Sequence, residues 1–148
     1  KIIKNLTFAA TAFLLSLWLQ TSTAQAGGKP QIEVTFTKWV TAFPQMEGFF
    51  GGDAGTGLFA GEVLNLTQIA GGQIWKIDAR YGFIADDPSK SFTAVIHGKH
   101  SWHTGIGILN GVITEGWHAG AQVHVEFQAI PDDVHGFAFQ GTITIQPN

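Results

Sequence analysis

The stretch that decides the fold is Gln73-Ile74-Trp75-Lys76-Ile77-Asp78-Ala79-Arg80-Tyr81-Gly82-Phe83-Ile84. From Trp75 to Phe83 every odd-numbered residue is apolar or aromatic, whereas Lys76 and Asp78 belong to the opposite set. Successive side chains of a β-strand point to opposite faces of the sheet, so this pattern predicts a strand with one buried face.

The same alternation recurs on both sides of this stretch. Less regular strands are predicted over Leu58–Thr67 and Gly105–Thr114. Both are apolar on both faces in places, so we expect each strand to be covered on both sides or to cross the centre of the structure. An eighth strand is predicted over Gln45–Phe50. The regular strands are Ile32–Thr37, Phe92–Ile96, Ala121–Gln128 and Phe137–Ile145.

This set of strands indicates an all-β protein, because no segment after Ala26 has a helical period. Seven or eight consecutive strands must protect their edges, either by closing into a barrel or by forming a sandwich. Turns that follow one another closely, without long crossovers, favour the barrel. We therefore expect a single antiparallel β-barrel of about seven or eight strands as one domain over residues 27–148.

The first 26 residues have the three parts of a cleavable signal peptide. Lys1 and Lys4 form a positive start, Leu6–Leu19 is an apolar run, and Ala24-Gln25-Ala26 is a small-x-small cleavage site. The apolar run is shorter than the roughly 20 residues that span a bilayer. Residues 1–26 are thus expected to be removed, which predicts a secreted or periplasmic protein without a membrane span after cleavage.

Composition limits the partners and the chemistry. Without Lys1 and Lys4 the chain has six basic and 11 acidic side chains, a formal charge of −5, and no basic cluster, so no nucleic-acid partner is expected. The chain has no cysteine, which excludes zinc–thiolate sites, iron–sulfur clusters and a cysteine nucleophile.

Two stretches share a glycine pattern, Gly55–Val63 and Gly105–Ile113. Each has Gly-x-Gly, then a third glycine four residues on, then a strand. Glycines at this spacing lie on one face of a strand, where they permit a sharp bend or the close approach of another backbone. A dinucleotide loop needs a following helix and a glycine where Ala60 stands, so no nucleotide and no other cofactor is expected.

At these glycines the chain resembles the allene oxide cyclase and dirigent-type β-barrels, which carry a turn similar to Gly55–Gly61. The resemblance covers about Gly48 to Gly111. It implies an eight-stranded barrel with a ligand-sized interior, assembled into trimers or dimers. It also implies guidance of cyclisation or radical coupling of hydrophobic molecules, or their binding without chemistry. No catalytic residue can be carried over.

Histidine offers two candidate sites. His97, His100 and His103 could gather around zinc or copper in a loop, or simply form a polar, exposed hairpin end. His124 and Glu126 point to the same face of one strand, as an acid–base pair requires. Because the intervening Val125 must face the core, His124 is expected to face outward.

The inward aromatics supply the leading hypothesis, an exported barrel that binds a small apolar or aromatic molecule without catalysis. The alternative is that these side chains merely fill the barrel. A cyclase or isomerase using His124 and Glu126 is the enzymatic rival. Trp102 and Trp117, which could stack on sugars, keep open a structural or carbohydrate-contacting surface protein. The predicted ligand-binding residues are Phe36, Trp75, Ile77, Tyr81, Phe92, Phe127 and Phe137.

Overall fold

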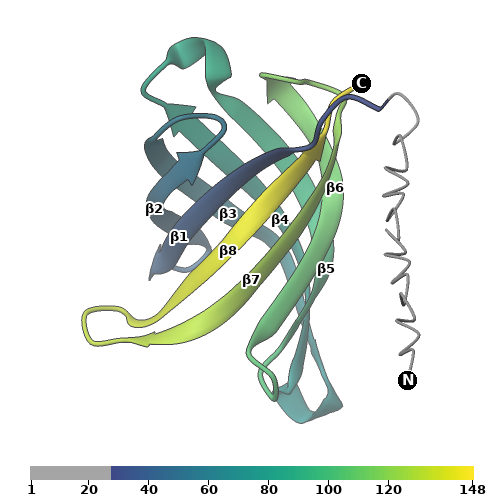
Figure 1. The fold of residues 1–148 in the computed structure, drawn as a ribbon. Helices are drawn as coiled ribbons and strands as arrows, with labels where there is room; N and C mark the ends of the chain where they lie inside the picture. The colour runs from purple at the N-terminus through teal and green to yellow at the C-terminus, as the bar shows by residue number, and fades with distance from the viewer. Residues whose placement is uncertain (1–27) are drawn as a thin grey trace, which may run out of the picture.

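The computed structural model describes residues 28–148 as eight strands with two short 3-10 turns (Figure 1). The predicted signal peptide, residues 1–26, lies outside the described residues and stays a prediction. The strands are β1 (Ile32–Ala42), β2 (Gln45–Gly52), β3 (Gly57–Ile69), β4 (Ile74–Ala85), β5 (Phe92–Ser101), β6 (Ile106–Gly116), β7 (Gln122–Asp132) and β8 (Gly136–Gln146). The 3-10 turns are Ala70–Gly72 and Pro88–Lys90.

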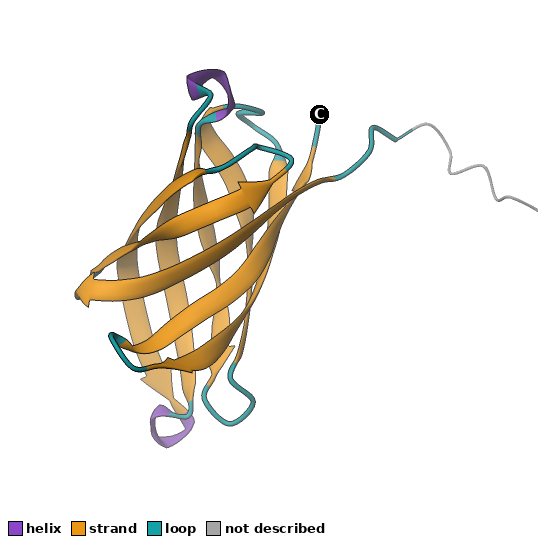
Figure 2. Ribbon diagram, turned by 60° about the vertical axis from the view of Figure 1, so that its left-hand side comes forward, coloured by secondary structure: helices purple, strands orange, loops and turns teal. Residues whose placement is uncertain are grey.

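The eight strands close into one antiparallel barrel in chain order (Figure 2). Each strand pairs with the next, and β1 closes the barrel by pairing with β8 from Ile32↔Ile145 to Lys38↔Phe139. Closure leaves no unpaired edge in the sheet. The predicted all-β, antiparallel barrel is confirmed, with eight strands.

Aromatic rings fill the end of the barrel interior at which β1 begins and β8 ends. We call it the packed end. Phe36 stacks on Phe59 at a centroid distance of 5.8 Å, and Phe83 stacks on Phe92 at 4.6 Å. All four rings are at most 3% exposed. Such ring pairs add about 0.5–1.5 kcal/mol each beyond the burial of their area, so the packed end carries much of the core.

The expectation that the strand predicted over Gly105–Thr114 is covered on both sides or crosses the centre of the structure is wrong for β6. Leu109 and Ile113 face the interior and are buried, but Ile106 and Ile108 lie on the outer surface and are each 46% exposed. The apolar outer face of this strand is therefore not covered by other described parts of the chain. Assembly into a homo-oligomer stays a prediction.

Inward glycines mark the places where neighbouring strands approach closely. A Cβ atom on Gly111 would lie 1.9 Å from the carbonyl oxygen of Val95, and one on Gly107 would lie 2.2 Å from the ring of Phe127. At Gly111 no side chain fits, because the atoms in the way are backbone, whereas at Gly107 the ring of Phe127 would have to move. The expectation that the glycines of the β6 stretch permit close backbone approach is confirmed at Gly111.

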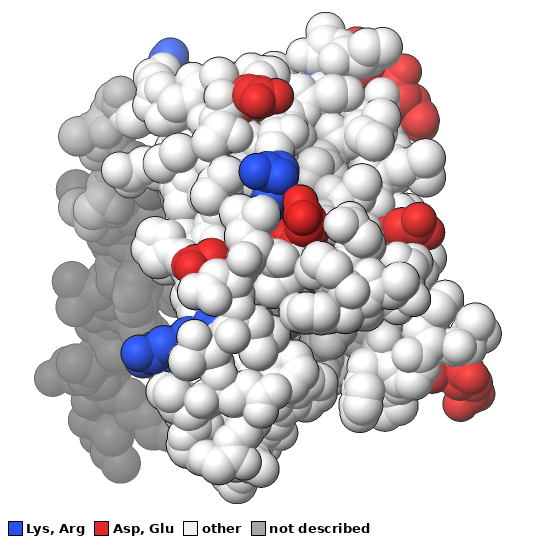
Figure 3. All heavy atoms as spheres, turned by 180° about the vertical axis from the view of Figure 1, so that it is seen from behind, with Lys and Arg blue, Asp and Glu red and all other residues white. Residues whose placement is uncertain are grey.

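The outer surface mixes charges of both signs among many uncharged side chains. On the face shown in Figure 3, the basic side chains are separated from one another and no basic cluster is visible. Within residues 28–148, no helix is long and apolar enough to cross a membrane. The absence of a nucleic-acid partner remains a prediction.

Candidate functional site

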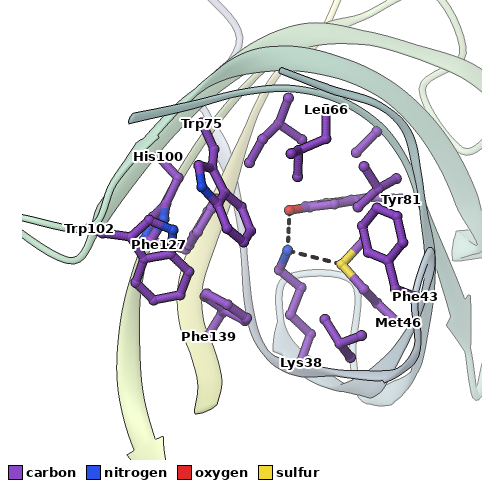
Figure 4. A pocket seen from close by; sticks show the side chains of 14 residues that line it. Lys38, Phe43, Met46, Leu66, Trp75, Tyr81, His100, Trp102, Phe127 and Phe139 are labelled. Carbon is purple, nitrogen blue, oxygen red and sulfur yellow. Dashed lines mark hydrogen bonds between the residues drawn. The ribbon is translucent and has the colours of Figure 1, made fainter. Parts of the chain in front are cut away.

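The end opposite the packed end contains a cavity, which we call the Lys38 cavity. At this open end lie the β1–β2, β3–β4, β5–β6 and β7–β8 connections. Side chains of 14 residues line the cavity (Figure 4). The volume of the cavity is about 60 Å³.

Lys38 lies inside the barrel because of its position in β1. Val34 and Phe36 precede it on the same inward face, and the alternation continues to Lys38, which is only 4% exposed. Its neighbour in β2 is Gly48, whose missing side chain leaves the lysine room. A Cβ atom on Gly48 would lie 2.0 Å from the carbonyl oxygen of Thr37, so this position admits no larger residue.

The ammonium group of Lys38 has no anionic partner among residues 28–148. Its Nζ donates a hydrogen bond to the hydroxyl oxygen of Tyr81 and lies 3.5 Å from Sδ of Met46. The ring centroids of Tyr81 and Phe127 are 4.4 and 4.7 Å away. No Asp or Glu is among the residues that line the cavity. Burial without a counter-ion disfavours the charged form and lowers the pKa of Lys38 to about 7.

The other polar groups of the cavity wall are also shaped by burial. Tyr81 is 1% exposed, and burial raises the pKa of its hydroxyl, which keeps it protonated. His100 donates from Nε2 to the carbonyl oxygen of Gly105 at 3.1 Å, and burial lowers its pKa. Nε1 of Trp102 is buried and has no hydrogen-bond partner among residues 28–148. Donors without acceptors are uncommon in protein interiors, so the last group calls for an explanation.

The structure separates the seven predicted ligand-binding residues into two groups. Phe36 and Phe92 belong to the packed end, and Phe137 is 50% exposed, with its ring edge against Trp102 at 5.5 Å. The other four line the Lys38 cavity: Trp75, Ile77, Tyr81 and Phe127.

Sequence reasoning missed Lys38, the polar centre of the cavity. The signal was present, since the alternation of Val34 and Phe36 extends two residues further to Lys38. A lysine breaks the apolar pattern, and charged residues are almost never fully buried without a partner. The next residue, Trp39, faces outward and stacks on His135 at 4.6 Å.

The three candidate metal ligands are not brought together. His97 is exposed on the outer surface of β5, His100 points into the barrel, and His103 lies in the exposed turn before β6. Residues three apart in a strand point to opposite faces, which separates the first two. Within residues 28–148, no group of three or more His, Asp or Glu side chains is placed to hold a metal ion.

His124 and Glu126 form a surface pair. Nε2 of His124 lies 3.1 Å from Oε1 of Glu126, and its Nδ1 lies 2.7 Å from Oδ1 of Asn110. The two side chains are 44% and 63% exposed. The expected outward orientation of His124 is confirmed, and the pair does not face the Lys38 cavity.

Because the His124–Glu126 pair is solvated, we expect Glu126→Gln to change the free energy of unfolding by less than about 1 kcal/mol. Urea denaturation of the variant and the wild type measures this difference. A loss of several kcal/mol would show that the pair is structurally important. Asn110→Ala is the companion variant, and it should be similarly mild.

The two tryptophans considered for sugar contact both pack against the barrel ends. Trp102 meets Trp75 edge-on at 5.1 Å at the open end, and Trp117 lies over Phe92 at 6.4 Å at the packed end. Neither is fully exposed. This arrangement caps the barrel and leaves no broad aromatic platform at these two positions.

Comparisons of the chain with protein-family models, curated proteins and solved structures gave no match. The resemblance of Gly55–Gly61 to the allene oxide cyclase and dirigent-type barrels therefore stays a prediction.

Proposed function

We propose that this protein is an exported β-barrel that binds a small apolar or aromatic molecule, without catalysis, in the Lys38 cavity. The observation that carries the proposal is a buried amine, without a carboxylate beside it, in a largely apolar cavity at the open end of the barrel. Ligand sites are typically apolar with a few convergent polar groups that orient the ligand. Export is supported by the signal-like composition of residues 1–26.

The alternative of a filled barrel fits the packed end better than the open end. A barrel that needs only a core would be more stable with an apolar residue at position 38, since burying an amine costs free energy. A residue that lowers the stability of the fold in this way is expected where function requires it. The unpartnered Nε1 of Trp102 adds a second buried donor in the same wall.

The size of the cavity defines how a ligand would sit. The cavity volume of about 60 Å³ is well below the roughly 300–1,000 Å³ of typical ligand pockets, so the cavity itself has room for only one end of such a ligand. A ligand would therefore place one polar end beside Lys38 and its apolar body in the mouth. Phe43, which is 64% exposed, and Leu66 stand at that mouth.

Filling the mouth should block binding. We expect 2-naphthalenemethanol to quench the fluorescence of Trp75 with a Kd in the micromolar range, about −8 kcal/mol. Leu66→Trp, which adds bulk in the cavity wall, should weaken binding at least about tenfold, or about 1.4 kcal/mol. Leu64→Trp is the matched control, because Leu64 is 43% exposed on the same strand and does not line the cavity.

Isothermal titration calorimetry measures the binding without fluorescence, so the tryptophan that each variant adds does not disturb the measurement. If Leu64→Trp and Leu66→Trp weaken binding equally, the ligand does not occupy the Lys38 cavity. If the wild type shows no saturable binding to naphthyl, fatty-acid or terpenoid probes, the filled barrel is the better description.

A further inference from the structure

Lys38 is unusual among the lysines of residues 28–148, because it is the buried one; Lys90 is half-buried and the others are exposed. Lys76 and Lys99 lie on the outer surface of the sheet, whereas Lys38 is 4% exposed. Nζ of Lys38 lies among the side chains that line the cavity, so a molecule that entered the cavity would meet this amine (Figure 4).

We propose that Nζ of Lys38 forms a reversible imine with the carbonyl carbon of an apolar aldehyde or ketone held in the Lys38 cavity. This inference rests on the proposed function and names the chemical class of the ligand. The lone pair of the neutral amine adds to the carbonyl carbon and gives a carbinolamine. A C=N bond then replaces the C–O bond, and the carbonyl oxygen leaves as water with both amine hydrogens.

The surroundings of Lys38 keep its amine available for this addition. Two titratable groups face this amine, Tyr81 on β4 and His100 on β5. The neighbours from the other strands have no titratable group; they are Met46 on β2, Phe59 on β3, Phe127 on β7 and Phe139 on β8. Desolvation without a counter-ion is one way in which lysine becomes a nucleophile for carbonyl compounds. With a pKa of about 7, roughly half of the amine is neutral at neutral pH.

Tyr81 is placed to assist the loss of water. Its hydroxyl is hydrogen-bonded to Nζ, and burial holds the hydroxyl in its protonated form. It can therefore donate a hydrogen bond to the oxygen of the carbinolamine. Neither amine nor carbonyl carries a charge, so this adduct avoids the cost of burying an ion pair.

A carboxylate ligand fits the cavity less well. Holding a buried carboxylate requires the desolvation of a second charge and several donors for its two oxygens. Here Nε2 of His100 already donates to Gly105, which leaves the amine of Lys38, the hydroxyl of Tyr81 and Nε1 of Trp102 as the donors of the wall. The neutral carbonyl is thus favoured over the anion by the donors that the wall provides.

The test uses three matched probes: 2-naphthaldehyde, 2-naphthalenemethanol and 2-naphthoate. The full chain is incubated with each probe and sodium cyanoborohydride at pH 7, and the modified lysines are located by peptide mass spectrometry. A lysine in water, with a pKa of about 10.4, is neutral in roughly one molecule in 2,500 at pH 7. We therefore expect the aldehyde to label Lys38 at least about tenfold faster than Lys76, with a rate that rises as the pH increases through about 7.

Two variants locate the reaction. Lys38→Met should lose the fast adduct, and Lys76→Met, which removes an exposed amine, should keep it. If Lys38→Met does not fold, peptide mapping of the wild type still identifies the labelled lysine. Labelling that is equal at Lys38 and Lys76, or that requires denaturant, would overturn the imine.

The three probes separate this inference from the proposed function. Binding of the alcohol and the aldehyde without an adduct at Lys38 overturns the imine but leaves the apolar binding site. Tighter binding of 2-naphthoate than of the aldehyde, again without an adduct, overturns the imine in favour of an anion site. No binding of any of the three rejects both proposals.

Discussion

Lys38→Met is expected to make the barrel more stable at neutral pH. In the wild type, burial lowers the pKa of Lys38 from 10.5 to about 7. A shift of this size corresponds to a cost on the order of 5 kcal/mol for keeping the amine in the folded state. Methionine has a similar length and no charge, and it suits the aromatic and thioether surroundings. Loss of the partner of the Tyr81 hydroxyl offsets about 1–3 kcal/mol of the gain.

The net gain of about 2–4 kcal/mol should raise Tm by roughly 5–15 °C for a domain of this size. Thermal unfolding followed by circular dichroism measures it. Lys76→Met is the matched control, because it removes an exposed amine of the same type, and it should change Tm only slightly. A destabilised Lys38→Met variant would show that the amine has a structural role and would weaken the case for a functional site.

The pH dependence of stability has a definite sign. Because the folded pKa of Lys38 lies below its unfolded value, the unfolded chain holds one more proton between about pH 7 and pH 10.5. The free energy of unfolding therefore contains a contribution that rises with pH across this window. Urea denaturation of wild type minus Lys38→Met, at several pH values, isolates that contribution. A flat difference from pH 7 to pH 10 would contradict the lowered pKa.

Gly111→Ala is the second large effect, and it should destabilise the protein by about 3 kcal/mol or more. The added Cβ would lie 1.9 Å from the carbonyl oxygen of Val95 and 2.8 Å from Cα of Ile96. These atoms belong to the backbone of β5, so they cannot move aside as a flexible side chain would. Strands β5 and β6 must separate, with loss of ladder hydrogen bonds between them.

Gly51→Ala is the control for Gly111→Ala. Gly51 also lies within a strand, and its added Cβ would meet nothing closer than Oγ1 of Thr35, at 3.9 Å. We expect a change within about 0.5 kcal/mol, with a small gain from the lower entropy of the unfolded chain. Denaturant unfolding of the two variants gives the comparison. Equal effects would mean that the close approach at Gly111 is not the cause.

Much of the barrel could be predicted because the alternation that identifies a strand is a local property of the sequence. The alternation in Gln73–Ile84 placed Tyr81 and Phe83 in the interior, where both are 1% exposed. The weaker pattern of Gln45–Phe50 was enough to predict β2. The candidate sites fared differently, since the three-residue spacing of His97 and His100 could not be interpreted until both were known to lie in one strand.

The all-β class, the approximate number of strands and the inward faces of most of them follow from the order of the residues alone, because a period of two depends only on neighbouring residues. That the interior is filled at Phe36 and Phe92 but leaves a cavity around Lys38 could be learned only from the assembled barrel. That division depends on the register in which side chains from different strands meet, and on the glycines that let those strands approach. The pKa of Lys38 is set by the same assembly, since desolvation comes from rings on β3, β4, β7 and β8 that are distant in the chain.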